Sequence, residues 1–463
     1  MDTGSTIAKE GAYSRFHSAM TYYPLLLLFL TISNSTFCQN PIVPAGVYLA
    51  DPSAHVWHDG KLYVYGSLDE STEYYCSYKY HVLSTSDLVH WDITENVFAS
   101  RGDNDKVPYS DKELYAPDCQ FKNGMYYLYY CQPDRKAAEG VATSKFPIGP
   151  FTSGASIALG GIEEIDPAVF IDDDGQAYYI WGQFDAKIAR LKPNMTEIDS
   201  LSIVPELATE KEHFFHEGAF MFKRNGIYYL VYSDISRGNQ PTCIGYSTSD
   251  SPWGPFKYGG VIVDNDNCDP STWNNHGSVV KFKGQWYVFY HRSTHNSRMM
   301  RKACVEPITF NMDGSINEVE MTSQGAGPPF NALEKIESEC ACLLLGNSRI
   351  ELFETMNEKL GGIQNGDKVA YKYIDFKDGA DQIQFRVKAL QNGGKISVRL
   401  DQPWGAEVGV LNIRGDEAGD WNTVTSKIKK VGGVHAVWLA FSGDKNELFE
   451  LDWFEFANNS EIE

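Results

Sequence analysis

Basic residues are scarce in this chain. It has 40 lysines and arginines against 61 aspartates and glutamates, which gives a formal net charge of −21. Proteins that bind nucleic acid neutralise phosphates with a basic surface, so this balance disfavours a nucleic-acid partner. The nine cysteines include no CxxC pair of the kind that binds zinc. A glycine-rich phosphate loop is also missing, and a nucleotide-dependent enzyme is therefore unsupported.

An apolar run long enough to cross a membrane is missing as well. Residues 22–32 are apolar, but a membrane-spanning helix needs about 20 such residues. Lys9 and Arg15 precede this run, and small residues stand at the two recognition positions of a cleavage site ahead of Gln39. We therefore predict that residues 1–38 are a signal peptide and that the protein is secreted, periplasmic or at the cell surface.

What recurs is a glycine-containing turn followed by a tyrosine-rich apolar run. It occurs five times, at residues 58–65, 122–129, 173–179, 224–229 and 282–290. Each copy is typical of a β-hairpin whose glycine supplies the positive backbone angle of the turn. Strand-only repeats at nearly regular spacing predict an all-β fold with a five-bladed β-propeller over residues 39–330.

Three carboxylates lie just ahead of these hairpins, namely Asp51, Asp166 and Glu217. Asp118 and His276 occupy corresponding places in the other two repeats. The inner strands of a propeller end at a central channel, so all five side chains are expected at one mouth. The sequence therefore predicts a convergent acidic site.

Paired carboxylates suit glycoside hydrolysis. One protonates the departing oxygen while the other activates water or attacks the sugar. A third acid close by raises the pKa of the proton donor through its negative charge. A non-catalytic glycan-binding propeller is the alternative from another class, and it has no need of both a base and a proton donor.

A second domain follows a Gly/Pro-rich stretch at residues 324–329. Residues 346–457 alternate as short strands, for example at 382–387 and 436–441. This pattern predicts a β-sandwich of jelly-roll type. No acid/base cluster of its own is visible in this segment.

The motifs of the first domain resemble glycoside hydrolase family 43. They are Ala50-Asp51-Pro52-Ser53, Ala116-Pro117-Asp118, Ile165-Asp166-Pro167-Ala168, His216-Glu217-Gly218 and Asn275-His276-Gly277-Ser278. The resemblance implies an enzyme that inverts configuration, with Asp51 as general base and Glu217 as general acid. It assigns to Asp166 the orientation of Glu217 and the raising of its pKa.

The resemblance also implies residues that contact the substrate. Arg292 matches an arginine that bonds hydroxyls of the sugar being cleaved off, and Trp181, Asp118 and His276 are further candidates. His276 matches a histidine near the propeller axis, often beside a calcium ion held largely through water. A channel histidine without metal is the other reading.

The C-terminal segment resembles carbohydrate-binding module family 6, through Gly419-Asp420-Trp421 and residues 448–454. Such modules stack a sugar on aromatic side chains and carry a structural calcium ion, and Trp421 matches one of those aromatics. Glu450 stands where an asparagine usually contacts the sugar. A sugar-binding module and a purely structural module are both open.

Together the two resemblances imply a monomeric enzyme acting on plant cell-wall polysaccharide or oligosaccharide. The expected activity is that of an α-L-arabinofuranosidase that removes arabinose side chains from arabinoxylan or arabinan. A β-xylosidase and a galactan-active glycosidase are the alternatives within the same family.

Overall fold

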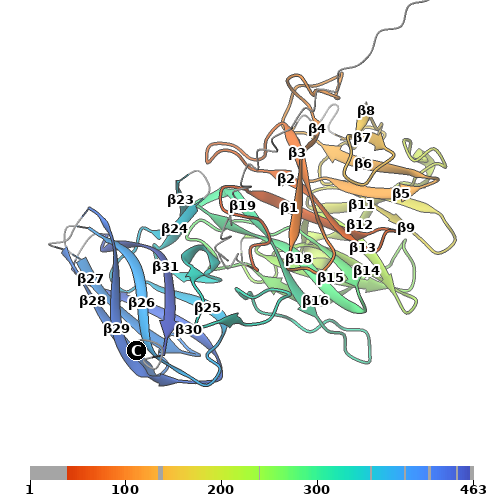
Figure 1. The fold of residues 1–463 in the computed structure, drawn as a ribbon. Helices are drawn as coiled ribbons and strands as arrows, with labels where there is room; N and C mark the ends of the chain where they lie inside the picture. Colours follow the sequence, from red (N-terminus) through yellow and green to blue (C-terminus); the bar gives the residue numbers. More distant parts are fainter. Residues whose placement is uncertain are drawn as a thin grey trace, which may run out of the picture. The chain divides into compact units, whose positions relative to one another are not determined.

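The computed structural model describes residues 39–133, 139–238, 240–354, 357–390, 393–415, 419–444 and 447–458 (Figure 1). The predicted signal peptide lies outside these residues. Within them, no helix is long and apolar enough to cross a membrane. Helical structure there is confined to η1 (Ser200–Ser202), α1 (Glu210–His213) and η2 (Ser338–Cys340), which confirms the all-β prediction.

The described part of the N-terminal domain forms five antiparallel sheets whose strands pair in chain order. Four sheets have four strands: β1 (Leu49–Val56), β2 (Leu62–Leu68), β3 (Lys79–Thr85) and β4 (Trp91–Ala99); β5 (Asp118–Lys122), β6 (Met125–Cys131), β7 (Glu139–Ser144) and β8 (Thr152–Ser156); β9 (Ala168–Ile171), β10 (Ala177–Trp181), β11 (Asp185–Arg190) and β12 (Val204–Thr209); β13 (Phe215–Arg224), β14 (Ile227–Asp234), β15 (Cys243–Ser249) and β16 (Lys257–Asp264). The fifth has three strands: β17 (Ser278–Phe282), β18 (Gln285–Thr294) and β19 (Ser297–Ile308).

The first strands of the five sheets form a closed ring. β1 contacts β5, β5 contacts β9, β9 contacts β13, β13 contacts β17, and β17 returns to β1. The five sheets are therefore the blades of a propeller, as the repeats predict. Each of the five repeat turns has its glycine at positive φ, between 76° and 91°.

The N-terminal segment completes the three-stranded fifth blade. The backbone N–H of Ile42 donates to the carbonyl of Ala303 in β19 at 2.8 Å. The buried Asn40 amide donates to the Val305 carbonyl and to Glu306, both at 2.9 Å, and its oxygen accepts the Val305 N–H at 2.8 Å. One segment from the start of the chain thus joins the last blade to the first.

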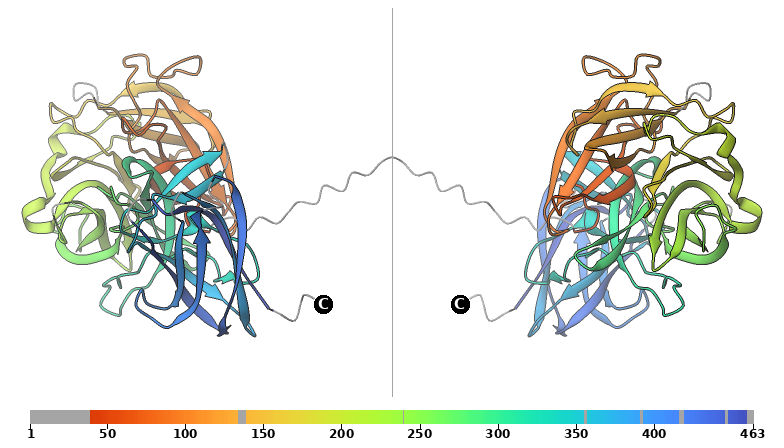
Figure 2. Two further views of the ribbon diagram at one scale, coloured as in Figure 1. Left: turned by 90° about the vertical axis from the view of Figure 1, so that its left-hand side faces the viewer. Right: turned by 90° about the vertical axis from the view of Figure 1, so that its right-hand side faces the viewer.

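The C-terminal domain is a β-sandwich (Figures 1 and 2). One sheet has the order β20-β25-β30-β27-β28 with β22 also paired to β25, and the other has β23-β24-β31-β26-β29 with β21 paired to β31. The strands are β20 (Phe330–Asn331), β21 (Ile336–Glu337), β22 (Leu343–Leu345), β23 (Arg349–Glu354), β24 (Asn357–Gly361), β25 (Lys368–Asp375), β26 (Ala380–Ala389), β27 (Gly393–Leu400), β28 (Glu407–Arg414), β29 (Trp421–Val431), β30 (Val434–Ser442) and β31 (Phe449–Ala457).

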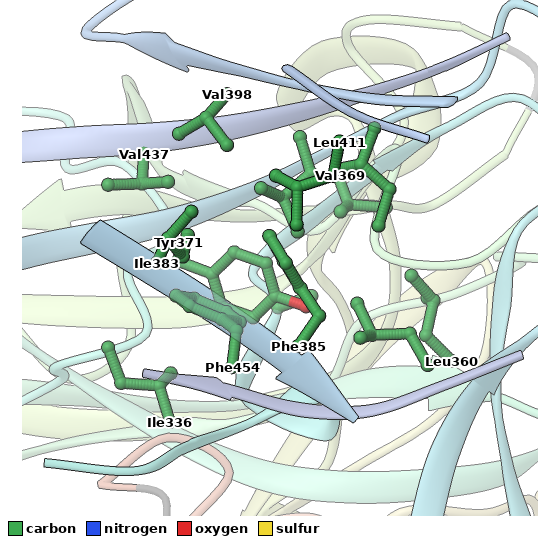
Figure 3. Close-up of a cluster of buried hydrophobic side chains, with 14 of the residues drawn as sticks. Ile336, Leu360, Val369, Tyr371, Ile383, Phe385, Val398, Leu411, Val437 and Phe454 are labelled. Carbon is green, nitrogen blue, oxygen red and sulfur yellow. The ribbon is translucent and has the colours of Figure 1, made fainter. Parts of the chain in front are cut away.

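An apolar core fills the space between these two sheets. Figure 3 shows Val369, Tyr371, Ile383, Phe385 and Phe454 pointing into it, and all five are fully buried. The alternation of buried and half-buried residues along β26 from Ile383 onward follows the period of two that the sequence displays there. We call this sandwich the module.

We expect Asn40→Ala to destabilise the propeller. The substitution leaves the buried N–H of Val305 without its acceptor and removes the N-terminal clamp, so the free energy of unfolding should fall by about 2–4 kcal/mol. Urea unfolding followed by tryptophan fluorescence measures this change. Asn194→Ala, at an exposed turn, is the matched control. An equal loss of unfolding free energy in both variants would contradict the role of Asn40 in holding the N-terminal segment to β19.

Candidate active site

One pocket of about 460 Å³ brings the three predicted catalytic carboxylates together. Asp51 comes from the first blade, Asp166 lies just before β9 of the third, and Glu217 is in β13 of the fourth. All three are at most 9% exposed. The site prediction from the repeats thus matches the observed convergence, and His276 lies in the same pocket.

Local backbone distortions turn these carboxylates toward the pocket. Asp51 and Asp166 have φ values of 52° and 63°, in a left-handed region that non-glycine residues rarely adopt. Asp51 also lies where the β1–β2 register shifts, and Glu217 lies at two register shifts of the β13–β14 pair. Such bulges re-aim side chains and are common beside active sites.

The carboxylate of Asp51 is held by one charge and several polar contacts. One oxygen accepts from Nη1 of Arg301 at 2.7 Å, and the other accepts from the Ser67 hydroxyl at 2.6 Å. Burial alone raises the pKa of Asp51. The positive charge of Arg301, together with His291 and His276, outweighs burial and lowers this pKa well below its ordinary value. Asp51 is therefore ionised at neutral pH and can accept a proton from water.

Arg301 is itself buried between two carboxylates. Besides Asp51, its guanidinium donates to both oxygens of Asp69, at 2.9 and 3.0 Å, and its backbone N–H donates to Asp69 at 2.9 Å. The guanidinium carbon also lies 5.1 Å from the ring centre of Tyr75, another pocket residue. The charge and geometry around Asp51 thus depend on this arginine.

Two amides hold the carboxylate of Glu217. Gln183 donates from Nε2 at 2.9 Å to one oxygen, and Asn274 donates from Nδ2 at 3.1 Å to the other. Gln183 is fixed in turn, because its backbone N–H donates to Glu164 at 2.7 Å. The orientation of Glu217 is therefore set by loops of the third and fifth blades.

Asp166 has the opposite electrostatic surroundings to Asp51. Burial and the negative charges of Glu217 and Asp51 raise the pKa of Asp166 well above its ordinary value. One pocket therefore combines an ionised carboxylate, Asp51, with a carboxyl group whose protonated form is favoured, Asp166, and general acid/base hydrolysis needs groups in both states.

His276 lies between two of the acids. Its Nδ1 is 3.7 Å from Asp51 and 3.9 Å from Asp166, and burial lowers the pKa of the imidazole. Gly218, at φ 68°, allows this approach, since a Cβ there would come within 2.9 Å of the ring. The expected place of His276 in the channel is therefore the observed one.

The residues around His276 do not fit direct coordination of calcium. Ca²⁺ takes six to eight oxygen ligands, and the described residues contain no group of three His, Cys, Asp or Glu side chains arranged to hold a metal. Calcium held through water at His276, and structural calcium in the module, both stay predictions. No step of the chemistry below depends on a metal.

Arg292 does not lie in the pocket, which corrects the expected sugar contact. It is 3% exposed and donates to the Tyr290 hydroxyl and to the Thr322 carbonyl, with Glu306 at 3.4 Å. The reason is strand alternation: His291 points toward Asp51, so the next residue of β18 points to the opposite face. Arg301 is the arginine that the structure places at the base.

Asp118 is also outside the pocket lining. This residue, 1% exposed, contacts Ser53 and His55 of the first blade and the backbone N–H of Val169 in the third, all at 2.6 Å. It therefore joins the inner strands of three blades. The expectation that Asp118 binds substrate does not agree with this burial.

Trp181 is fully buried in the interior of the propeller. Its ring packs in the apolar cluster around β6 and β10, and its indole N–H donates to the Ile162 carbonyl at 2.9 Å. It too is a structural residue in this conformation and not the expected sugar contact. The aromatic walls of the pocket are instead Tyr75, Tyr115, Phe184 and Trp273.

Several pocket residues escaped the sequence interpretation. Asn274 stands two residues before His276, so its segment carried a usable signal. Arg301 and Gln183 carried none, because Arg301 is one of several basic residues in β19 and Gln183 stands outside the repeated motifs.

In the module, Trp421 is already in contact with two side chains. Its ring lies 5.2 Å from that of Phe353, and the Arg386 guanidinium carbon is 5.3 Å from the ring centre. Glu450 pairs with Lys359. Sugar stacking on Trp421 stays a prediction and would compete with these contacts.

Comparison with known proteins identifies both domains. The family model for glycosyl hydrolases family 43 matches residues 38–316, and that for carbohydrate binding module family 6 matches residues 347–458. A curated relative, an arabinoxylan arabinofuranohydrolase of Bacillus subtilis (strain 168), is 30% identical over 92% of this chain and 94% of its own. A xylosidase/arabinosidase of Thermoclostridium stercorarium is 29% identical over 87% of this chain and 96% of its own.

The solved structures agree. A family 43 arabinoxylan arabinofuranohydrolase from Bacillus subtilis, crystallised with cellotetraose, has a TM-score of 0.54 and 28% identity, covering 91% of this chain and 98% of that one. A β-xylosidase/α-arabinofuranosidase from a compost metagenome has a TM-score of 0.52 and 32% identity over 60% of this chain and 96% of its own.

Removing Arg301 should move the pH dependence of activity. In Arg301→Met the positive charge that lowers the Asp51 pKa is lost, so the base becomes protonated at a higher pH. The acid limb of the kcat/KM profile should shift upward by about 1–3 pH units.

Arg292→Met is the matched control. It removes an equally buried arginine that faces Glu306 and should lower stability while leaving the acid limb in place. An upward shift in the Arg292 variant, or none in the Arg301 variant, would contradict the assignment.

Proposed function

The chain belongs to glycosyl hydrolase family 43, and we propose that this glycoside hydrolase removes α-L-arabinofuranosyl side chains from arabinoxylan or arabinan. The observation that carries the proposal is the single pocket in which Asp51 has a lowered pKa and Asp166, beside Glu217, a raised one. The proposed substrate is taken from the names of relatives that match this chain over both of its domains.

In the proposed mechanism, Asp51 is the general base and Glu217 the general acid. Asp51 takes a proton from water as the water oxygen bonds to the anomeric carbon. The glycosidic C–O bond breaks, its electron pair goes to the leaving oxygen, and Glu217 gives that oxygen a proton. Attack opposite to departure inverts the configuration.

Asp166 and the amides act on the acid. Burial and the negative charge of Glu217 raise the pKa of Asp166, which favours a protonated carboxyl group beside Glu217. Gln183 and Asn274 fix the direction in which the Glu217 carboxyl presents that proton. Correct orientation of this kind supplies a large share of the rate acceleration in enzymes.

The pocket supports recognition of a sugar at the end of a chain or branch. Its volume suits a small sugar. The sugar ring can stack on aromatic walls such as Phe184 and Trp273, while polar groups of the pocket fix the orientation of the sugar. Phe184 and Trp273 are 48% and 37% exposed, so both rings are accessible to a substrate.

A β-xylosidase activity is the second candidate. The Thermoclostridium relative and the compost-derived structure each carry both activities in their names. Activity on galactan is the remaining alternative. We further propose that the protein is exported, which the N-terminal sequence and the polysaccharide-directed domains support; the monomeric state stays a prediction.

The substrate is tested with aryl α-L-arabinofuranoside beside aryl β-D-xylopyranoside, using the wild type and Asp51→Ala. We expect hydrolysis of the arabinoside and its loss in the variant, since the variant lacks the carboxylate that takes the proton from water. A preference for the xyloside would transfer the proposal to the second candidate. Undiminished activity of Asp51→Ala would overturn the mechanism.

Glu217→Gln should separate binding from turnover. The amide keeps the shape but has no acidic proton, so kcat on arabinoxylan should fall by about 10²–10⁴-fold while arabinoxylan still binds. An aryl arabinoside with a good leaving group needs less protonation and should lose less. Measurement of kcat on both substrates and of binding by calorimetry tests this, and equal losses would remove Glu217 from its role.

A further inference from the structure

The loop that holds the catalytic acid is itself held by the C-terminal module. Residues 265–277, between β16 and β17, carry Trp273, Asn274 and His276, three residues of the pocket. The ends of this loop are fixed by the propeller, where Asn265 and Asn275 donate to backbone carbonyls of residues 241 and 242. Its middle part has different supports.

The first support is direct. The backbone N–H of Leu344 in β22 donates to the carbonyl of Asn267 at 2.7 Å. Cys342, two residues earlier in the chain, donates instead to Ala370 of the module at 2.8 Å. β22 is therefore a strand of the module that bonds β25 on one side and the loop on the other.

The second support passes through the turn of the β18–β19 hairpin. Asp269 accepts the N–H of Asn296 at 3.0 Å and that of Ser271 at 2.8 Å, so its carboxylate links loop and turn. The Ser271 hydroxyl also donates to the Asn296 side chain at 2.8 Å. Movement of the turn therefore moves the loop.

The module fixes this turn. The two central residues of the turn, His295 and Asn296, have φ values of 64° and 50°, which is strained for histidine. The N–H of His295 donates to the Ile350 carbonyl at 2.7 Å, and its Nε2 accepts the Leu352 N–H at 3.1 Å, both in β23. The strained residue is thus bonded through backbone and ring.

A buried ion pair fastens the same contact. Glu358 of β24 is 0% exposed and accepts from the Tyr48 hydroxyl at 2.8 Å and from Lys302 of β19. Lys302 directly follows Arg301, the arginine at the base. The interface between module and propeller therefore lies one residue from the active site.

We propose that the module is a positioning element for catalysis: through β22 and β23 it fixes the 265–277 loop, and so the Asn274 amide that orients Glu217. The proposal rests on the proposed function of Glu217 as proton donor. Leu344, His295 and Asp269 are positioning residues in this scheme and do not touch the reacting atoms.

The scheme makes a specific kinetic prediction. Loosening the loop misdirects the Glu217 proton, so the loss of kcat should be larger for a poor leaving group than for a good one. We expect Asp269→Ala to lower kcat on phenyl α-L-arabinofuranoside by about 10–100-fold and on the 4-nitrophenyl analogue by less. Asp269→Asn, which keeps one acceptor oxygen, should fall between Asp269→Ala and the wild type.

The contribution of the module is isolated by a matched pair. Leu344→Pro and Leu344→Ala both lose the apolar side chain, but only proline removes the N–H that donates to Asn267. The proline variant should show an additional leaving-group-dependent loss that the alanine variant lacks. Glu320→Gln breaks another contact with the module, to Lys372, and should leave the leaving-group dependence unchanged.

The outcomes distinguish the two proposals. Inactivity of the wild type on aryl arabinoside and aryl xyloside would overturn the proposed function. An active wild type whose Leu344→Pro and Leu344→Ala variants behave alike, or whose Asp269→Ala variant loses kcat equally on both leaving groups, would overturn the positioning role alone. Melting temperatures of all variants identify any that fail to fold. If a Leu344 variant does not fold, the Asp269 variants decide whether the loop has the positioning role.

Discussion

The interaction on which this active site depends is the burial of one guanidinium between two carboxylates. Arg301 on the last strand of the propeller bonds Asp51 and Asp69, which lie on and directly after the first two strands. Removing Arg301 would leave both buried carboxylates without their cation, a costly state in a low dielectric. A contact between the last and the first blade therefore also favours the ionised form of Asp51.

The contrast between Asp51 and Asp166 follows from that one contact. Both side chains are buried to a similar extent, and burial favours the protonated form of each. Asp51 has Arg301 within hydrogen-bonding distance, whereas Asp166 faces the charge of Glu217, so their pKa values move in opposite directions. Two aspartates whose pKa values are shifted in opposite directions thus occupy one pocket.

Sequence reasoning found the fold and the acids because both recur with the repeat. Turn glycines and tyrosine-rich strands are local signals, and a carboxylate ahead of such a hairpin has a defined place at the propeller mouth. Arg301 has no such place. Whether Arg292 or Arg301 faces the pocket depends on strand register, in which a shift next to the turn pairs Ser293 with Arg301, and register is a property of the folded sheet.

Register also explains why the module matters to the pocket. Neighbouring residues of a strand point to opposite faces, so Arg301 reaches the carboxylates of the pocket while Lys302 reaches Glu358 of the module. A slip of β19 by one residue would put only one of the two cations into the other's place and an apolar neighbour, Met300 or Ala303, into the remaining place, so that buried carboxylates would lose a partner. Since both faces of the strand carry buried ion pairs, each pair enforces the register that the other requires, and the module thereby helps to fix Arg301 at the base.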